Sequence, residues 1–162
     1  MTATLTSLRE PRGARRSRGI AVVEFVITAP FLLLLLLAGA ELGRAFVQYA
    51  TLSHSIRDSA RFVSDNAING TTGVVDLDNA IITQARNLAV YGNIAGTGNA
   101  KLPNYLPGQI QVINVGNSNI QVTASYPYQP MLGVTLPTIV MGTGPISQTF
   151  NMQVAVTMRA IS

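Results

Sequence analysis

The sequence predicts an α+β fold in which one long N-terminal helix packs on a small antiparallel sheet, with a short second helix between them in the chain. Three observations lead to this class. Residues 20–40 form an apolar run, residues 42–63 continue with apolar side chains at helical spacing, and three short segments beyond residue 108 alternate between polar and apolar. With 48% hydrophobic and 11% charged residues, the composition excludes a disordered tail.

Residues 20–43 are expected to form a transmembrane helix. Between Ile20 and Ala40 the sequence carries one charge, Glu24, and a run of leucines from 32 to 37. A helix over this stretch is about 31 Å long, which matches the hydrocarbon core of a bilayer. A core helix of a soluble protein would show a polar face here, and this segment has none.

The formal charge of +4 lies entirely in residues 1–18, which hold five arginines and Glu10. Residues 19–162 hold six basic and six acidic side chains and are neutral. The basic leader therefore places the N-terminus in the cytoplasm and residues from about 45 onward outside, by the positive-inside rule. A neutral body also removes the main support for nucleic-acid binding.

The side chains needed for catalysis or metal binding are scarce. The chain has no cysteine and a single histidine, His54, which no acidic residue is placed to orient. We therefore expect no enzymatic activity, no metal and no cofactor.

Two common targeting signals begin in the same way as this chain. A cleaved signal peptide has an apolar region of about 7–15 residues and a small-residue cleavage site, whereas this run is longer. An uncleaved signal anchor fits the length, so a signal-anchored extracytoplasmic binding domain outside any filament stays open as the alternative. Neither signal accounts for Glu24.

Residues 44–66 continue the helix outside the membrane as an amphipathic segment. No glycine or proline interrupts it, and Asn69-Gly70 supplies a stop. Its expected inner face is a mostly apolar stripe with spacings of four and three, formed by Leu42, Phe46, Tyr49, Ser53, Ile56, Ala60 and Val63. Arg57, Asp58 and Arg61 lie off this stripe, where they could contact a partner subunit or form an ordinary solvated face.

Residues 67–162 are expected to form a small α+β domain. A helix with Ala80 to Tyr91 is capped by Asp76 or Asp78 and stopped by Gly92, and residues 93–108 form a loop. Strands are expected at Gln109–Val115, Asn119–Tyr126 and Gln148–Arg159, with a hairpin at residues 116–118. Pro127, Pro130 and Pro137 are expected to break the chain into a loop or an edge. Helix 44–66 would cover the apolar face of the strands.

Glu24 is the most informative residue, because a carboxylate inside a membrane span is costly and usually has a partner. Cleavage after Gly19 would place a new α-amine on Ile20, one helical turn from Glu24. The two charges could then neutralise each other within a subunit or between neighbours. Glu24 would set the register of assembly, as a single buried polar group does in coiled coils.

This segment resembles the prepilin-peptidase processing pattern of type IV pilins, with Gly19, four residues and then Glu24-Phe25 at the head of an apolar helix. The similarity extends to TadE-like pseudopilins (minor pilins) of the tight-adherence (Tad/Flp, type IVb pilus) system. The residues that carry it are Ala21-Val22-Val23-Glu24-Phe25, Pro30 in the leucine run, Glu41-Leu42-Gly43-Arg44 and the stretch Ser55–Val63. It covers residues 18–64 well and the remainder only in general layout.

The resemblance implies a pilin-like fold, with residues 1–19 as a cytoplasmic leader removed by a prepilin peptidase between Gly19 and Ile20. Glu24 and Phe25 would serve assembly and register in a single-pass protein of the bacterial inner membrane. The implied partners are other pilin and pseudopilin subunits and the Tad inner-membrane assembly platform, in support of adhesion and biofilm formation. Major Flp pilins have almost nothing beyond the helix, so the large domain here favours a minor subunit.

Overall fold

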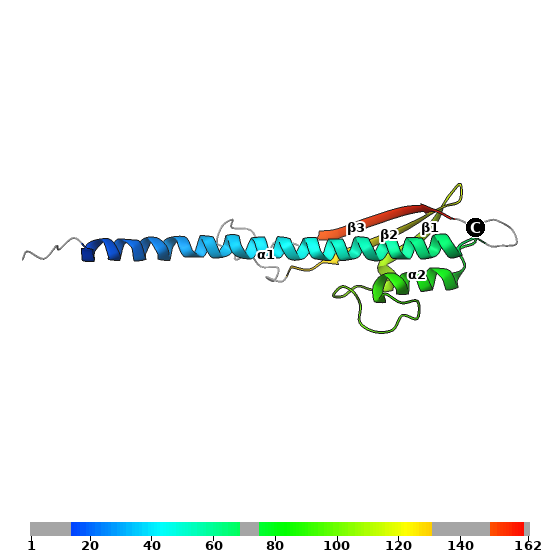
Figure 1. Cartoon of the computed structure of the whole chain (residues 1–162), viewed down its shortest axis with the longest axis horizontal. Helices are drawn as coiled ribbons and strands as arrows, with labels where there is room; N and C mark the ends of the chain where they lie inside the picture. The colour runs from blue at the N-terminus through cyan, green and yellow to red at the C-terminus, as the bar shows by residue number, and fades with distance from the viewer. Residues whose placement is uncertain (1–13, 69–74, 131–149, 161–162) are drawn as a thin grey trace, which may run out of the picture. The chain divides into compact units, whose positions relative to one another are not determined.

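A computed structural model describes residues 14–68, 75–130 and 150–160, with side chains from residue 19 onward (Figure 1). The chain divides into two compact units, residues 1–40 and 41–162, which are described separately. The elements are, in chain order, α1 (Ala14–Asn66), α2 (Asn79–Tyr91), the 3₁₀ turn η1 (Pro107–Gln109), β1 (Ile110–Gly116), β2 (Asn119–Tyr128) and β3 (Phe150–Arg159). The predicted α+β class is confirmed.

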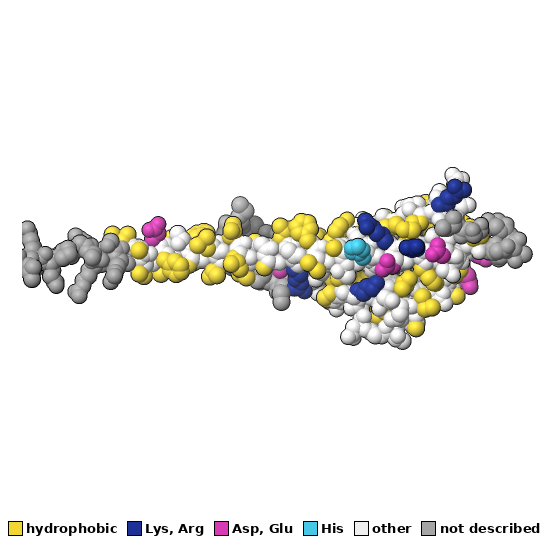
Figure 2. All heavy atoms as spheres, viewed as in Figure 1, with side chains coloured by type: hydrophobic (Ala, Val, Ile, Leu, Met, Phe, Trp, Pro, Cys, Tyr) yellow, Lys and Arg dark blue, Asp and Glu magenta, His cyan; other side chains and the backbone are white. Residues whose placement is uncertain are grey.

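In the first unit, α1 begins at Ala14, six residues before the predicted start, and continues through Pro30 without a break. Its large apolar side chains between residues 20 and 37 are 39–74% exposed, and Figure 2 shows them uncovered along the helix. The most apolar window of 18 residues has a mean hydropathy of 2.7 with none of it buried. By length and composition, this helix could cross a membrane.

The sheet of the second unit is antiparallel with the strand order β1-β2-β3. The hairpin between β1 and β2 is confirmed, and Asn117 (φ 52°) and Ser118 (φ 58°) both have left-handed backbones. Two consecutive positive φ angles are typical of the type I′ turns that match the twist of a tight hairpin.

The predicted end of the second strand at Tyr126 is wrong. β2 continues through Tyr128, with Pro127 opposite Asn151 and Tyr128 opposite Phe150 on β3. Pairing with β1 reaches only Ala124, so Pro127 lies beyond β1, where a missing backbone N–H costs no ladder hydrogen bond.

Helix α2 ends as predicted at Gly92, whose left-handed backbone (φ 79°) lets its N–H donate to the Leu88 carbonyl at 2.9 Å. Asp78 occupies the N-cap position, but its side chain makes no capping hydrogen bond. The predicted stop at Asn69-Gly70 and the predicted first residue of the last strand, Gln148, lie outside the described residues.

The core of the second unit lies between α1, α2 and the inner face of the sheet. In Figure 1 the sheet and α2 lie on different sides of the C-terminal part of α1. Leu52, Ile56 and Val63 of α1 are fully buried in one cluster with apolar residues of β2 and α2. The amphipathic helix therefore covers the sheet, as its spacing predicted.

The predicted inner stripe of α1 is only half right. Ile56, Ala60 and Val63 are buried, but Leu42, Phe46 and Tyr49 are 59%, 65% and 47% exposed. The buried face instead includes Gln48, Leu52, Ser55 and Ser59. At Ser59 this face meets α2, because Ser59 Oγ donates to the Ala85 carbonyl of α2 at 2.9 Å.

Candidate functional site

The residues predicted for processing and register all lie on one continuous stretch of α1. Ile20 and Glu24 are one turn apart and line the same shallow helix face as Gly19, Val23, Ile27 and Thr28. Side chains at this spacing have Cβ atoms about 5–6 Å apart. Ile20 and Glu24 therefore lie on one face of the helix.

Phe25 points in a different direction from Glu24. One residue further along the helix, it lies about 100° around the axis, and its ring is 66% exposed. Within the described residues of this unit, the Glu24 and Phe25 side chains are both solvent-exposed. Both side chains are therefore available for contacts outside the helix.

Gly19 has no conformational reason to be glycine. Its backbone is helical, and a Cβ added there would meet nothing within 4 Å. Glycine inside a helix costs about 1 kcal/mol relative to alanine. The fold of the described residues therefore does not require this glycine.

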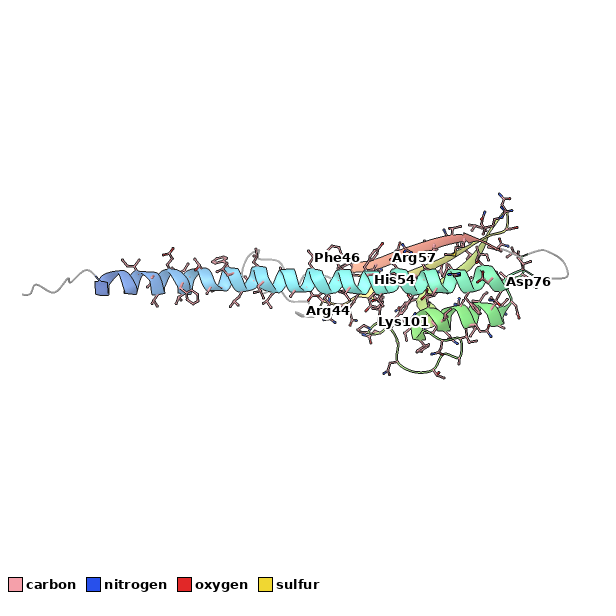
Figure 3. The ribbon with its side chains drawn as sticks, viewed as in Figure 1. Arg44, Phe46, His54, Arg57, Asp76 and Lys101 are labelled. Atoms are coloured by element: carbon pink, nitrogen blue, oxygen red, sulfur yellow. The ribbon has the colours of Figure 1, made fainter. Side chains whose placement is uncertain are left out.

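Arg57, Asp58 and Arg61, the predicted partner-contact residues, are brought together on an exposed face of the second half of α1. Figure 3 labels Arg57 beside His54 and Lys101, and Figure 2 shows cationic side chains gathered over this part of the helix. Lys101 Nζ lies 3.9 Å from Asp58 Oδ2, and the Asp58 side chain is 65% exposed, so this long ion pair contributes little stability. The surface is open to a partner, and nothing in the described chain covers it.

A contact without any signal in the sequence joins the end of the sheet to the start of the second unit. Tyr128 Oη donates a short hydrogen bond to Glu41 Oε1, and the same hydroxyl lies 3.4 Å from the Glu41 carbonyl oxygen. The Tyr128 side chain is 1% exposed, and its burial, together with the Glu41 carboxylate, raises its pKa to about 12. Because 87 residues separate the pair, no local pattern could have predicted it.

Phe150 completes this contact from β3. Its ring packs on Tyr128 with centroids 4.9 Å apart and planes tilted by 32°. The first residue of β3 and the last of β2 are therefore held together beside Glu41. We call Glu41, Tyr128 and Phe150 the sheet anchor.

A second aromatic pair, Tyr105 and Tyr126, lies in the core. Tyr105 and Tyr126 meet edge to face at 5.8 Å, and Tyr126 Oη donates to the Pro103 carbonyl at 2.9 Å. Burial raises the pKa of Tyr105 to about 12. These contacts hold the loop before β1 against the sheet, and both tyrosine side chains are buried.

Metal ligands do not gather in the described part of the chain, where no three His, Asp or Glu side chains come close enough to hold an ion. The side chains that α1 exposes are available for contacts with other molecules.

Comparison with known families matches this same helix. Residues 19–61 match the family model described as TadE-like protein. This segment is TadE-like. The matched stretch runs from the predicted processing site through the exposed arginines, so the resemblance inferred from the sequence is confirmed. The TadE-like family is a pilin-type structural family and not an enzyme family. No curated protein and no solved structure matches the chain.

Proposed function

We propose that the chain is a minor pilin subunit (pseudopilin) of a type IVb Tad/Flp pilus. A prepilin peptidase removes residues 1–19, and the mature subunit enters the pilus through its N-terminal helix, in support of adhesion and biofilm formation. The TadE-like match supports the coarse assignment to a Tad-system pilin-like protein.

One observation carries the proposal, namely Glu24 as the one charged residue in the exposed apolar segment 20–40 of α1, one turn from Ile20. A mid-membrane acid costs about 2.5–3.5 kcal/mol on insertion scales and less near the interface. A new amine on Ile20 offsets that cost by pairing with the carboxylate. Pairing between neighbouring subunits fixes their stagger.

Gly19 gives independent support. Because the fold places no steric demand on this position, a glycine there is better explained by a peptidase that recognises the residue before the cut. Gly19→Val should keep the helix and abolish cleavage.

Before assembly, the subunit is anchored in the bacterial inner membrane by one helix, residues 20–43, with its N-terminus in the cytoplasm. Residues 44–66 and the domain from 67 to 162 lie outside, until assembly places them in an extracellular pilus. The Tad assembly platform and other pilin and pseudopilin subunits are the proposed partners, and Arg57, Asp58 and Arg61 offer them an exposed charged face.

The assembly role of Glu24 is tested by Glu24→Ala, with Glu24→Gln as the isosteric control for shape. Both variants should insert into the membrane, because removing a charge from a span favours insertion. Both should then fail to appear in sheared pilus fractions. Normal incorporation of either variant would refute the register role.

The rival function is a signal-anchored extracytoplasmic binding domain that never enters a filament. It predicts an uncut leader and no effect of Glu24 substitution. Intact mass of the membrane form, measured beside the pilus assay, separates the two functions.

A further inference from the structure

An apolar groove lies in the second unit between the start of its α1 segment and the start of β3. It is lined by Leu42, Ala45, Phe46 and Tyr49 of the helix and by residues 150–153 of the strand. Phe46 is 65% exposed and Phe150 is 51% exposed. Figure 3 shows Phe46 on the side of α1 along which β3 begins. The groove contains the residues wrongly predicted to face the core.

The sheet anchor fixes the level of this groove along the helix. Tyr128 bonds to Glu41, and Phe150 packs on Tyr128 at the end of the β2–β3 ladder. Glu41 directly follows the apolar run of residues 20–40. The strand side of the groove is thus held at Glu41, close to residue 43, where the proposed membrane span ends.

The chemistry of the groove fits a bilayer interface. Residues 42–49 of a helix extend about 10 Å, close to the depth of about 5–10 Å to which interfacial helices bury their apolar faces. Phenylalanine, tyrosine and leucine line it, and aromatic residues such as tyrosine are enriched where a membrane meets water. Its polar members, Asn151 and Gln153, are uncharged, so no carboxylate in the lining would repel anionic headgroups.

We propose that this groove is a lipid-docking surface. Before assembly, it contacts lipids of the outer leaflet at the boundary between their headgroups and acyl chains. The inference rests on the proposed membrane anchoring. It adds that the folded domain touches the bilayer through Phe150 of the sheet, in addition to being tethered by its helix. Docking fixes the orientation of the domain on the membrane.

Because the chain has no tryptophan, a single substitution gives an unambiguous fluorescent probe. Phe150→Trp reports on the groove from the strand side and Phe46→Trp from the helix side. The control is Ile113→Trp on β1, where the native side chain is 44% exposed. Ile113 pairs with Gln121, seven residues along β2 from Tyr128, or about 23 Å from the sheet anchor.

Each full-length variant is reconstituted into phosphatidylglycerol–phosphatidylcholine vesicles containing lipids that carry a quencher at different depths. Both groove probes should emit at shorter wavelength and be quenched several-fold more than the Ile113 probe, most strongly by labels near the headgroup. Equal quenching of the Phe150 and Ile113 probes would overturn the inference. So would a blue shift at Phe150 that depends on protein density and resists lipid quenchers, because a second copy would then fill the groove.

Flotation of the same vesicles keeps the two proposals apart. A chain that fails to float with lipid contradicts the membrane anchoring itself. A chain that floats while its Phe150 probe stays unquenched contradicts only the lipid-docking surface.

Discussion

Tyr128→Phe removes one hydroxyl from the sheet anchor and leaves the buried ring in place. The lost bond joins a phenol to a carboxylate, and hydrogen bonds to charged groups contribute about 1.5–3 kcal/mol. Glu41 is half-exposed and water can replace part of the bond, so we expect the lower end of that range. A loss of about 1.5 kcal/mol corresponds to slightly more than tenfold more frequent opening, because about 1.4 kcal/mol is a factor of ten.

Hydrogen–deuterium exchange of the full chain in detergent micelles measures this opening. Amides at the end of β2 and the start of β3 should exchange about tenfold faster, because these strands pair next to the anchor. The hairpin end at Asn119 should change little.

Tyr126→Phe is the matched control two residues away. Its hydroxyl donates to the neutral Pro103 carbonyl, and such bonds contribute about 1 kcal/mol. Its effect should therefore be smaller and should appear around residues 102–105. If Tyr126→Phe accelerates exchange at Phe150 as much as Tyr128→Phe does, the sheet anchor does not hold that end of the sheet.

Three further predictions concern the second unit. Gly92→Ala should lower the thermal midpoint by several degrees in a circular-dichroism melt. The reason is that the alanine would have to adopt a φ of 79°, and its Cβ would lie 3.0 Å from Lys101 Cε. An unchanged midpoint would contradict the left-handed cap at this residue. Because folding raises the pKa of Tyr128 to about 12, the unfolded chain loses the Tyr128 proton at a lower pH than the folded chain does. Between about pH 10 and 12, this residue should therefore lower the free energy of unfolding by up to about 1.4 kcal/mol for each pH unit. Tyr128→Phe should abolish this contribution of Tyr128 to the pH dependence of stability. In an absorbance titration of tyrosinate, the variant should lack one of the late deprotonation steps, while the late step of Tyr105 remains. Ile56→Ala should destabilise the domain by about 2–5 kcal/mol in a denaturant titration, because the side chain is fully buried; a loss below 1 kcal/mol would place Ile56 outside the core.

Local patterns predicted the elements of this fold well. The Gly116-Asn117-Ser118 hairpin and the stop at Gly92 follow from turn chemistry that acts over a few residues. The α+β class follows from the change between helical spacing and strand alternation. These signals need no knowledge of distant contacts.

The face of α1 could not be predicted in the same way. Leu42, Phe46 and Tyr49 extend the apolar stripe in the sequence, yet the sheet and α2 pack on a face displaced by about one residue, which holds Gln48 and Leu52. Which face is buried depends on where the other elements lie, and hydrophobic spacing alone does not contain that information.

The candidate site likewise contains residues that local sequence patterns predicted and a contact that they did not. Glu24 was found as an acid in an apolar run, and Gly19 by its position after the basic leader, five residues before Glu24. The contact between Glu41 and Tyr128 was missed because it exists only once the fold has brought distant residues together. The lipid-docking surface depends on that contact and was equally hidden from the sequence.

The N-terminus of the mature chain tests the central claim most directly. Full-length chain is expressed in cells with an active prepilin peptidase, extracted from membranes and analysed by intact mass and N-terminal sequencing. A mature chain that begins at Ile20, with Gly19→Val left uncut, is the predicted result. A chain from the same cells that still begins at Met1 or Thr2 would contradict processing and the pairing of a new amine with Glu24.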